Sequence, residues 1–474
     1  MVSKAEGRVE PPKEKMELRF EEIARACGGK TIGRGAAGPV RRVSTDSRTI
    51  EKGDVFFALK GARYDGHTYI NEVWQKGVRL FAVSAAAAVP EACLAEGSFL
   101  IVPDTLAAYG QTAHYHRRRF KIPVVAVTGS CGKTTVKELV WHVLSRRFKT
   151  LKNHGTENNL VGVPKTLLQI EDGHQAVVLE LGTNQPGEIE RLAWIASPGA
   201  GVITQIGHSH LEGLGSLEGV RAEKMGLLKH LDKGGVLFVN GEDPMLEGSR
   251  SGVHRVRRAG FSEGCDIRAE HVWTRESGTA FSRNGVSYET PLIGRHNVLN
   301  ALLAVAIGES FGMTPDEIQK GLGSFRPVPG RLQFRVIEGI HFLDDSYNSN
   351  PNSLKAAFEA LKDFKLRERK AVVCGDMLEM GAASETAHRE AGALIAGLGF
   401  DYVIAAGPAC RWLVDEAVKR GLAPSRVHHT ADAVQAGELC RQIAQPGDRV
   451  LVKGSRGMHM EKVFQAFDLS SRSL

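Results

Sequence analysis

The stretch from Val124 to Thr135 constrains the fold of this chain more than any other. An apolar run ending at Val127 leads into Thr-Gly-Ser-Cys-Gly-Lys-Thr-Thr, and apolar residues at helical spacing follow from Val136 to Leu144. A buried strand, a glycine turn and a helix in this order bring free N–H groups and the positive end of the helix dipole to one point. We therefore predict a polyphosphate site in an α/β domain with a parallel sheet.

Each residue type in this turn suits a bound nucleotide. Gly129 and Gly132 let the backbone close around the phosphates, Lys133 supplies positive charge, and the Thr134 hydroxyl can reach Mg²⁺. The predicted nucleotide-binding residues of the turn are Gly129, Ser130, Cys131, Gly132, Lys133, Thr134 and Thr135. The spacing G-x-x-G-K-T is shorter than the common G-x-x-x-x-G-K-T loop, which argues against an ordinary P-loop NTPase.

Two further strands provide candidate groups near this turn. Glu180 ends the apolar run 176–179, so its carboxylate should face the phosphate crevice and bind Mg²⁺ together with Thr134. A surface carboxylate on an edge strand is the alternative. His208 and His210 follow the next strand, but no cysteine or third histidine follows at a usual zinc spacing, so we favour His210 as a single group near the nucleotide.

Composition limits the classes of protein and the compartment. A length of 474 residues suits two to four domains, and no apolar run reaches the ~18 residues of a membrane helix. Seven cysteines without a C-x-x-C pair predict a reducing compartment, and charges at Lys4, Glu6, Arg8 and Glu10 argue against a signal peptide, so we expect a cytoplasmic protein. The net charge of +7 is spread along the chain and forms no basic stripe on a recognisable module, which indicates anionic small substrates and no nucleic acid. Because no apolar run is long enough to span a membrane, we also expect no membrane partner.

Short apolar runs that alternate with helical stretches predict an α/β chain of three domains. Pro327, Pro329 and Gly330 mark the last linker. The predicted segments are a disordered extension (1–15), a small N-terminal α/β domain (16–121), a central parallel-sheet domain of P-loop ATPase type (122–328) and a C-terminal Rossmann-like domain (329–474).

The motifs taken together resemble those of the Mur ligases, the ATP-dependent amide-forming enzymes of peptidoglycan precursor synthesis. The resemblance covers nearly the whole chain in order, and its motifs are Thr128 to Thr135, Glu180-Leu-Gly, His210-Leu-Glu-Gly, Lys224, Gly294 to Asn300, Pro329-Gly-Arg331 and Asp344 to Pro351. The stretches Asn158 to Pro164 and Gly375 to Gly381 resemble the member that adds D-alanyl-D-alanine. The Asp-Asn-Pro-Arg motif of the member that adds diaminopimelate is absent.

The resemblance implies a ligase reaction with ATP and Mg²⁺, at two metal sites, as cofactors. ATP would phosphorylate the terminal carboxylate of UDP-N-acetylmuramoyl-tripeptide. The amine of D-alanyl-D-alanine would then displace phosphate and give UDP-N-acetylmuramoyl-pentapeptide. Diaminopimelate and lysine are both compatible with these motifs as the third residue of the peptide, and we expect a monomer with the N-terminal domain binding the UDP end of the substrate.

The resemblance also implies roles for individual residues. Lys133 would hold the ATP phosphates, Thr134 and Glu180 one Mg²⁺ and His210 a second, and Lys224 would be carbamylated by CO₂ to complete the metal site. The catalytic residues would be Lys133, Lys224, His210 and Glu180; further nucleotide contacts His296, Asn297, Asn300, Arg331 and Asp345; and substrate contacts Ser47, Arg48, Thr156, Asn158, Tyr347 and Asn348.

One departure from the family pattern concerns Lys224. Many relatives have a glutamate two residues after this lysine, whereas this chain has Gly226. Taken alone, Lys224 is an ordinary helix lysine, for which solvent exposure is the default expectation.

Three other functions are compatible with parts of the sequence. A ligase resembling folylpolyglutamate synthetase would share the short loop and the third domain, although such enzymes usually lack an N-terminal module of this kind. A regulatory NTPase or kinase would turn over ATP without an amine acceptor. A nucleic-acid-binding ATPase would bind DNA with a steep dependence on salt.

Overall fold

The computed structural model describes residues 17–34, 38–61, 64–86, 89–249, 254–275, 278–362 and 369–467. The extension predicted for residues 1–15 lies outside the described residues. The chain divides into two compact units. The first comprises residues 17–122, 159–175 and 194–197, and the second comprises the rest of the described chain.

A parallel sheet in the order β7-β6-β5-β4, extended by the antiparallel strand β2, forms the centre of the first unit. Its elements are β1 (Leu18–Arg19), α1 (Phe20–Cys27), β2 (Lys30–Gly33), β3 (Pro39–Val40), β4 (Val43–Ser44), β5 (Val55–Phe57), η1 (Gly66–Tyr69), α2 (Ile70–Gln75), β6 (Leu80–Val83), η3 (Glu91–Cys93), β7 (Ser98–Ile101), α3 (Thr105–Arg118) and α5 (Gly162–Leu167). Phe81 and Phe99 on neighbouring strands stack with ring centroids 5.0 Å apart and are fully buried. Aromatic packing therefore stabilises one face of this sheet.

The second unit begins with a parallel sheet in the order β14-β13-β12-β11-β8-β10-β9. Its elements are β8 (Val124–Thr128), α4 (Lys133–Leu144), β9 (Thr150–Lys152), β10 (Ala176–Glu180), α6 (Glu188–Ala196, whose last residues belong to the first unit), β11 (Ala200–Ile203), α7 (Leu211–Leu214), α8 (Leu217–Met225), η4 (Gly226–His230), β12 (Val236–Asn240), η5 (Pro244–Leu246), β13 (Arg255–Gly260) and β14 (Ile267–Arg268). Strand β8 lies between β10 and β11, so the segments that follow these three parallel strands leave the sheet at the same edge.

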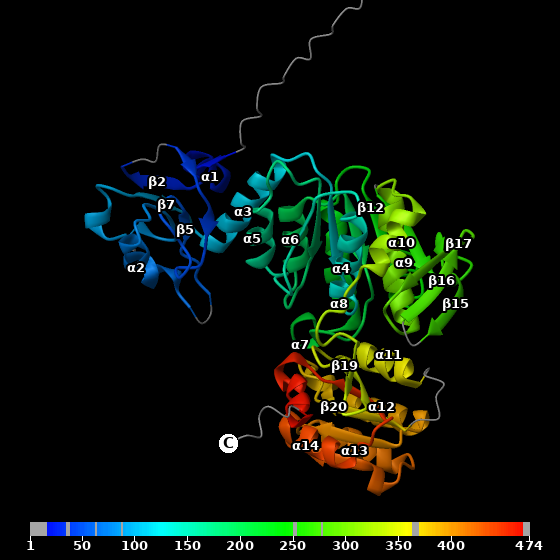
Figure 1. The fold of residues 1–474 in the computed structure, drawn as a ribbon. Coiled ribbons are helices and arrows are strands. Elements are labelled where there is room, and N and C mark those ends of the chain that lie inside the picture. The colour runs from blue at the N-terminus through cyan, green and yellow to red at the C-terminus, as the bar shows by residue number, and fades with distance from the viewer. Residues whose placement is uncertain are drawn as a thin grey trace, which may run out of the picture. The chain divides into compact units, whose positions relative to one another are not determined.

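An antiparallel sheet and two helices complete the central part of the second unit. They are β15 (Glu270–Arg275), β16 (Gly278–Arg283), β17 (Val286–Thr290), α9 (Arg295–Ser310) and α10 (Pro315–Gly323). Helix α9 packs against α4 and is buried on most of its surface, as the apolar sequence of its second half requires (Figure 1). The first turns of α9 therefore lie next to the glycine turn at the start of α4.

The C-terminal part of the second unit is a Rossmann-like sheet in the order β18-β19-β23-β20-β21-β22, in which only the pair β18–β19 is antiparallel among the described strands. Its elements are β18 (Gln333–Ile337), β19 (Ile340–Asp345), α11 (Pro351–Lys362), β20 (Lys370–Gly375), η6 (Gly381–Ala383), α12 (Ser384–Leu398), β21 (Tyr402–Ala406), α13 (Cys410–Lys419), η7 (Pro424–Arg426), β22 (Val427–Thr430), α14 (Ala433–Ile443), β23 (Arg449–Lys453), η8 (Arg456–Met458) and η9 (Met460–Phe467). Two separate clusters of buried apolar residues pack on this sheet. Across the described ranges, no helix combines the length and the apolar character needed to cross a bilayer.

Candidate active site

The turn between β8 and α4 has the backbone shape of a phosphate-binding loop. Gly129 and Gly132 have φ angles of 143° and 81°, in the region that favours glycine. A side chain at Gly129 would collide with Thr204 Oγ1, and a Cβ atom at Gly132 would lie 2.7 Å from Asn300 Oδ1. The turn therefore needs glycine at both positions, and the N–H groups of the first turn of α4 lie beside it.

Hydrogen bonds to the segment after β11 fix this turn. The Ser130 N–H donates to Gln205 O at 2.7 Å, and the Ser130 hydroxyl donates to Gly207 O at 2.9 Å. The Thr204 hydroxyl donates to Cys131 O. These bonds tie the turn to the segment that follows the neighbouring strand.

Lys133 and Thr134 open helix α4. Lys133 Nζ donates to Gly129 O at 2.7 Å, and burial lowers the pKa of Lys133, although the negative charge of Glu180 opposes this shift. Thr134 is 2% exposed, and its hydroxyl oxygen has no hydrogen-bond partner within the described residues. A buried hydroxyl of this kind needs a partner, and it provides a free oxygen ligand beside the phosphate turn.

Glu180 ends β10, and in the sheet it is paired with Val127 of β8. Its side chain is 1% exposed. Oε1 accepts a hydrogen bond of 2.8 Å from Asn158 Nδ2, whereas Oε2 is buried and finds no partner in the part of the chain that the structure describes. The Asn158 amide thus orients the carboxylate and leaves one oxygen free.

Lys224, on α8, is fully buried, with an exposed fraction of 0%. Among the described residues, none forms a hydrogen bond with its Nζ. Burial lowers the pKa of Lys224 well below its usual value, and the positive charge of Lys133 lowers it further, while Glu223 and Glu188 oppose the shift. A buried amine with a lowered pKa and no described partner loses its proton, and so becomes a nucleophile, more readily than a surface lysine does.

His210 directly precedes α7 and has a left-handed conformation, with φ of 53°. Its Nδ1 lies 2.8 Å from Glu379 Oε2 in the C-terminal part of the same unit. Burial lowers the pKa of His210, with a further contribution from the charge of Lys133, and Glu379 opposes the shift. His210 is therefore held in place by Glu379, a residue of the Gly375 to Gly381 motif to which the sequence assigns no role.

The four residues predicted to be catalytic lie close enough together for their charges to interact. The charges of Lys133 and Glu180 both act on Lys224, and those of Lys133 and Lys224 act on His210. Of these four residues, only Lys133 belongs to the glycine turn, and the other three come from separate strand ends and helices. The structure brings them together where the parallel strands end, as the sheet order requires.

A cavity of about 380 Å³ opens beside the glycine turn. The predicted nucleotide and substrate residues that line it are Ser130, Cys131, Gly132, Thr135, His296, Asn297, Asn300, Arg331, Asp345 and Asn348. Gly129, Lys133 and Thr134 are not among the lining residues. Burial, with a contribution from the charge of Lys453, lowers the pKa of His296 to about 4, so this imidazole is neutral at physiological pH.

Lys453 also lines this cavity, and the motifs do not include it. It ends β23 directly beside Asp345 of β19, forms an ion pair with that carboxylate, and donates to Asn348 O at 2.9 Å. Like Glu180, Lys453 is a charged residue at the end of a buried apolar run, and this pattern in the sequence could have identified it.

Two predicted substrate residues meet at the edge of this site. The Tyr347 hydroxyl donates to Thr156 Oγ1 at 3.0 Å. The guanidinium groups of Arg331 and Arg456 lie 4.3 Å and 5.4 Å from the centre of the Tyr347 ring. Tyr347 thus keeps two positive charges close to Thr156.

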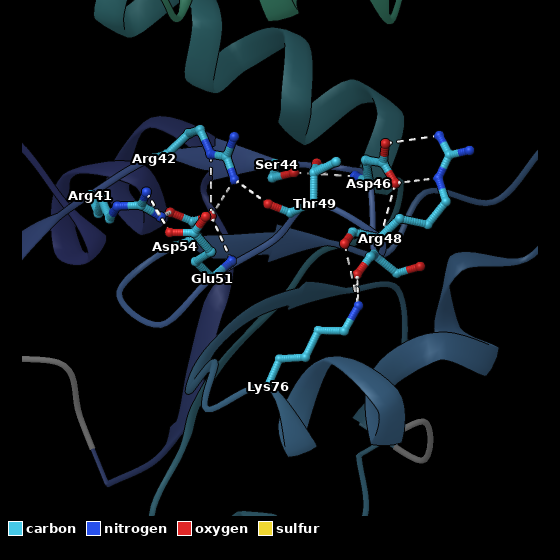
Figure 2. Close-up of polar contacts among 10 residues, drawn as sticks. Arg41, Arg42, Ser44, Asp46, Arg48, Thr49, Glu51, Asp54 and Lys76 are labelled. Carbon is cyan, nitrogen blue, oxygen red and sulfur yellow. Dashed lines mark hydrogen bonds and ion pairs between the residues drawn. The ribbon is translucent and has the colours of Figure 1, made fainter.

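The remaining predicted substrate residues, Ser47 and Arg48, lie in the first unit, after β4. Figure 2 shows Arg48 beside Asp46. The Asp46 carboxylate accepts hydrogen bonds of 2.9 Å from Arg48 Nε and Nη2, and these bonds lower the pKa of Asp46 to about 2. Lys76 Nζ donates to Ser47 O at 2.6 Å. The side chain of Arg48 is 85% exposed, so this loop is preorganised and its guanidinium group faces solvent.

The base of this loop is closed by a second cluster, also shown in Figure 2. The fully buried carboxylate of Asp54 accepts from Arg41 and Arg42, and Arg42 also donates to Thr49 O at 2.7 Å. The polar groups of this loop are therefore largely satisfied by one another.

Three family models match the chain. They are the Mur ligase family catalytic domain at residues 39–124, the Mur ligase middle domain at residues 127–308, and the Mur ligase glutamate ligase domain at residues 330–456. Together with the sheets described above, these matches confirm the α/β architecture of three domains.

Relatives and solved structures agree with the family models. The UDP-N-acetylmuramoyl-tripeptide–D-alanyl-D-alanine ligase of Bacillus subtilis is 34% identical over 90% of this chain and 92% of its own length. The crystal structure of MurF from Acinetobacter baumannii matches with a TM-score of 0.86 and 31% identity, over 96% of this chain and 99% of that one. MurF ligase from Thermotoga maritima in complex with ADP matches with a TM-score of 0.81 and 27% identity, over 92% of this chain and 99% of that one.

This chain belongs to the Mur ligase family, and the family prediction is confirmed. The rival resemblance to folylpolyglutamate synthetase has a structural counterpart as well. Mycobacterium tuberculosis folylpolyglutamate synthase shares 18% identity and a TM-score of 0.59 over 77% of this chain, which is a likeness of fold alone.

Proposed function

We propose that this chain is an ATP-dependent ligase that joins D-alanyl-D-alanine to UDP-N-acetylmuramoyl-tripeptide, giving the pentapeptide, ADP and phosphate. The observation that carries the choice of substrates is the match, over nine-tenths of both chains, to a relative named for this reaction. The phosphate turn and the buried groups beside it supply the chemistry that the reaction needs.

The reaction needs activation because a carboxylate does not lose an oxide ion to an attacking amine. The terminal carboxylate of the tripeptide attacks the γ-phosphorus of ATP, the bond to ADP breaks, and an acyl phosphate forms. The free amine of D-alanyl-D-alanine then attacks the acyl carbon, and phosphate leaves with the bonding electrons while the amine loses a proton.

Two anions must meet in the first step, and the site concentrates positive charge where they do. Lys133 and the first turn of α4 act on the ATP phosphates. Arg331 and Arg456, held on Tyr347, extend this positive region towards Thr156. Removing one such contact typically costs ~10²-fold or more in rate, about 3 kcal/mol.

The residues beside the turn fit a magnesium ion. Thr134 Oγ1 and Glu180 Oε2 are hard oxygen donors, both buried, and both lack a hydrogen-bond partner in the described ranges. We propose that they hold one Mg²⁺ and that His210 contributes to a second. When bound, Mg²⁺ neutralises part of the phosphate charge.

We further propose that Lys224 is carbamylated. A neutral amine adds to CO₂ to give a carbamate and a proton, and the burial of Lys224 without a described partner favours this reaction over protonation. The new carboxylate would complete the oxygen ligands of the metal site. The expected test is turnover in CO₂-depleted buffer, which should fall and recover on addition of bicarbonate, whereas unchanged turnover would contradict the modification.

The remaining roles are those that the family resemblance implies. His296, Asn297, Asn300, Arg331 and Asp345 are proposed to contact the nucleotide, and Ser47, Arg48, Thr156, Asn158, Tyr347 and Asn348 the UDP-peptide. The predicted domain boundaries and the monomeric state remain proposals. We place the reaction in the cytoplasm, where ATP is supplied.

Product mass tests the proposed function directly. The enzyme is mixed with ATP, D-alanyl-D-alanine and a UDP-N-acetylmuramoyl-tripeptide, in parallel with diaminopimelate and with lysine as third residue. At least one mixture should yield the pentapeptide with phosphate release that depends on D-alanyl-D-alanine. Phosphate release that is independent of the amine acceptor would instead identify an NTPase.

A further inference from the structure

Lys137 is a buried lysine that the proposed mechanism does not use. It lies one turn along α4 from Lys133, with an exposed fraction of 0%. Its Nζ donates to Asn153 O at 3.0 Å and to Gly155 O at 2.9 Å, and it lies 3.0 Å from Glu138 Oε1. A buried ammonium group with backbone carbonyls as partners fixes the shape of the segment that carries them.

The segment that Lys137 holds, residues 153–158, carries contacts to the candidate metal ligand. The Asn153 side chain pairs with the backbone of Glu180, since Oδ1 accepts from Glu180 N at 2.9 Å and Nδ2 donates to Glu180 O at 3.1 Å. At the other end of the segment, Asn158 Nδ2 donates to Glu180 Oε1 at 2.8 Å. Thr156, a proposed substrate contact, lies between these two asparagines in the sequence.

We infer that Lys137 is a positioning residue for the proposed reaction. Its ammonium group fixes the turn at Asn153 and Gly155, and this turn sets the direction of the Asn158 amide. The amide in turn orients the Glu180 carboxylate, so that Oε2 faces the metal position. The effect on turnover rests on the proposed function, whereas the effect on the loop does not.

The charge of Lys137 is needed because an apolar side chain at this position would leave the buried carbonyl oxygen of Asn153 and the part-buried one of Gly155 without their ammonium partner. Glu138 balances that charge, but it also forms an ion pair with Lys152. Lys152 packs its ammonium group over the Trp141 ring at 3.7 Å and is a second member of the same cluster. Lys152 donates to Glu138. Substitution of Lys152 therefore removes a positive charge from the cluster while the bonds from Lys137 to the loop carbonyls remain.

The test compares Lys137→Met with Lys137→Arg and with the matched control Lys152→Met. Hydrogen–deuterium exchange of the full chain without ligands is measured on peptides that cover residues 153–158. We expect exchange about tenfold faster in Lys137→Met, an intermediate rate in Lys137→Arg, and the wild-type rate in Lys152→Met. Equal rates in Lys137→Met and the wild type would overturn the inference.

The Mg²⁺ dependence of turnover is a second measurement, and it should not change if Lys137 has a purely structural role. Loss of a residue that orients a metal ligand typically weakens metal binding 10-fold to 100-fold. We expect the Mg²⁺ concentration for half-maximal turnover to rise about tenfold in Lys137→Met and to stay unchanged in Lys152→Met. A lower thermal stability with an unchanged Mg²⁺ requirement would reduce Lys137 to a structural residue.

Two controls keep these outcomes separable. If Lys137→Met does not fold, Lys137→Gln, which keeps a neutral donor, replaces it in both measurements with the same expected direction. If the wild-type chain forms no pentapeptide, the proposed function fails, and the exchange experiment still decides whether Lys137 holds the loop.

Discussion

The candidate substrate loop of the first unit and the phosphate site of the second differ in how their polar groups are satisfied. In the loop after β4, Asp46 is paired with Arg48, Asp54 with Arg41 and Arg42, and the Ser47 carbonyl with Lys76. At the phosphate site, Thr134 Oγ1, Glu180 Oε2 and Lys224 Nζ are buried, and none has a partner in the residues that the structure describes.

The difference indicates what each region requires from its ligand. A loop whose polar groups bond to one another keeps its shape without substrate, and it gains affinity only from added contacts. Buried groups without partners carry a desolvation cost that a bound ion, phosphate or covalent modification can remove. Substitutions at the phosphate site should therefore change turnover, and those at the substrate loop should change affinity.

The largest effect is expected at Lys133. Lys133→Met removes the positive charge beside the phosphates, and kcat should fall by ~10²-fold to 10³-fold. The KM for the UDP-tripeptide should change little. Steady-state kinetics for both substrates checks this prediction, and a loss confined to KM would contradict the contrast between the two regions.

Local signals in the sequence predict much of this site. Glu180 is predicted to lie near Thr134 because the carboxyl ends of parallel strands meet at one edge of the sheet, and the structure places both there. The burial of Lys224 is not predictable locally, because a lysine on a helix usually faces solvent and only tertiary packing covers this one.

The contacts that sequence reasoning misses are long-range. Lys453 reaches Asp345 because β23 is inserted beside β19, a pairing that no short motif encodes. Glu379 reaches His210 across a similarly long stretch of chain. The antiparallel strands β15 to β17 also escape prediction, because short runs of alternating residues do not reveal which strands pair.

The second effect concerns Arg331, whose guanidinium group lies over Tyr347 at the edge of the phosphate site. Arg331→Ala should lower kcat by ~10²-fold, since it removes a positive charge from the region where the two anions meet. Binding of the UDP-tripeptide, measured by calorimetry, should stay near the wild-type value. Arg326→Ala, an exposed position close in sequence, is the matched control and should leave kcat unchanged.

Acidification should affect His296 at the phosphate site but not the Asp46–Arg48 pair of the substrate loop. The pKa of His296 is about 4, below the ordinary value of 6.5, so between these pH values the unfolded chain binds a proton that the folded chain does not. Lowering the pH from 6.5 to 4 should therefore decrease the free energy of unfolding. The contribution of this residue to the decrease is at most about 3 kcal/mol. The Asp46–Arg48 pair stays ionised throughout, because the pKa of Asp46 is about 2.

Thermal unfolding of the wild type and of His296→Asn between pH 7 and pH 4 measures this difference. The variant should lose less stability than the wild type over the window. Parallel curves for the two proteins would show that His296 does not contribute.

Cys131 offers a chemical probe of the phosphate turn. Its thiol is half-buried and donates to Asn350 Oδ1 at 3.2 Å. Alkylation should reduce turnover more than tenfold, because the added group occupies the cavity beside the turn. ATP should slow the labelling of Cys131 but not that of Cys265, as measured by peptide mass. Equal labelling rates at Cys131 with and without ATP would contradict a nucleotide at this turn.

The smallest effect is expected in the substrate loop. Arg48→Ala removes an exposed guanidinium group, and the KM for the UDP-tripeptide should rise about tenfold, or about 1.4 kcal/mol, with kcat nearly unchanged. Arg34→Ala, also exposed in the first unit, is the control and should leave KM unchanged. A large loss of kcat in Arg48→Ala would break the contrast, since it would give the loop a role in the chemical step.

The two glycines of the phosphate turn have a consequence for chemical inhibition. A side chain at Gly129 would collide with Thr204, and one at Gly132 would collide with Asn300. Both glycines also have backbone angles that other residues rarely adopt. A compound that packs against these two positions would meet a surface that point substitution cannot reshape without straining the turn. Resistance would have to arise elsewhere, which makes this short stretch of backbone a durable target.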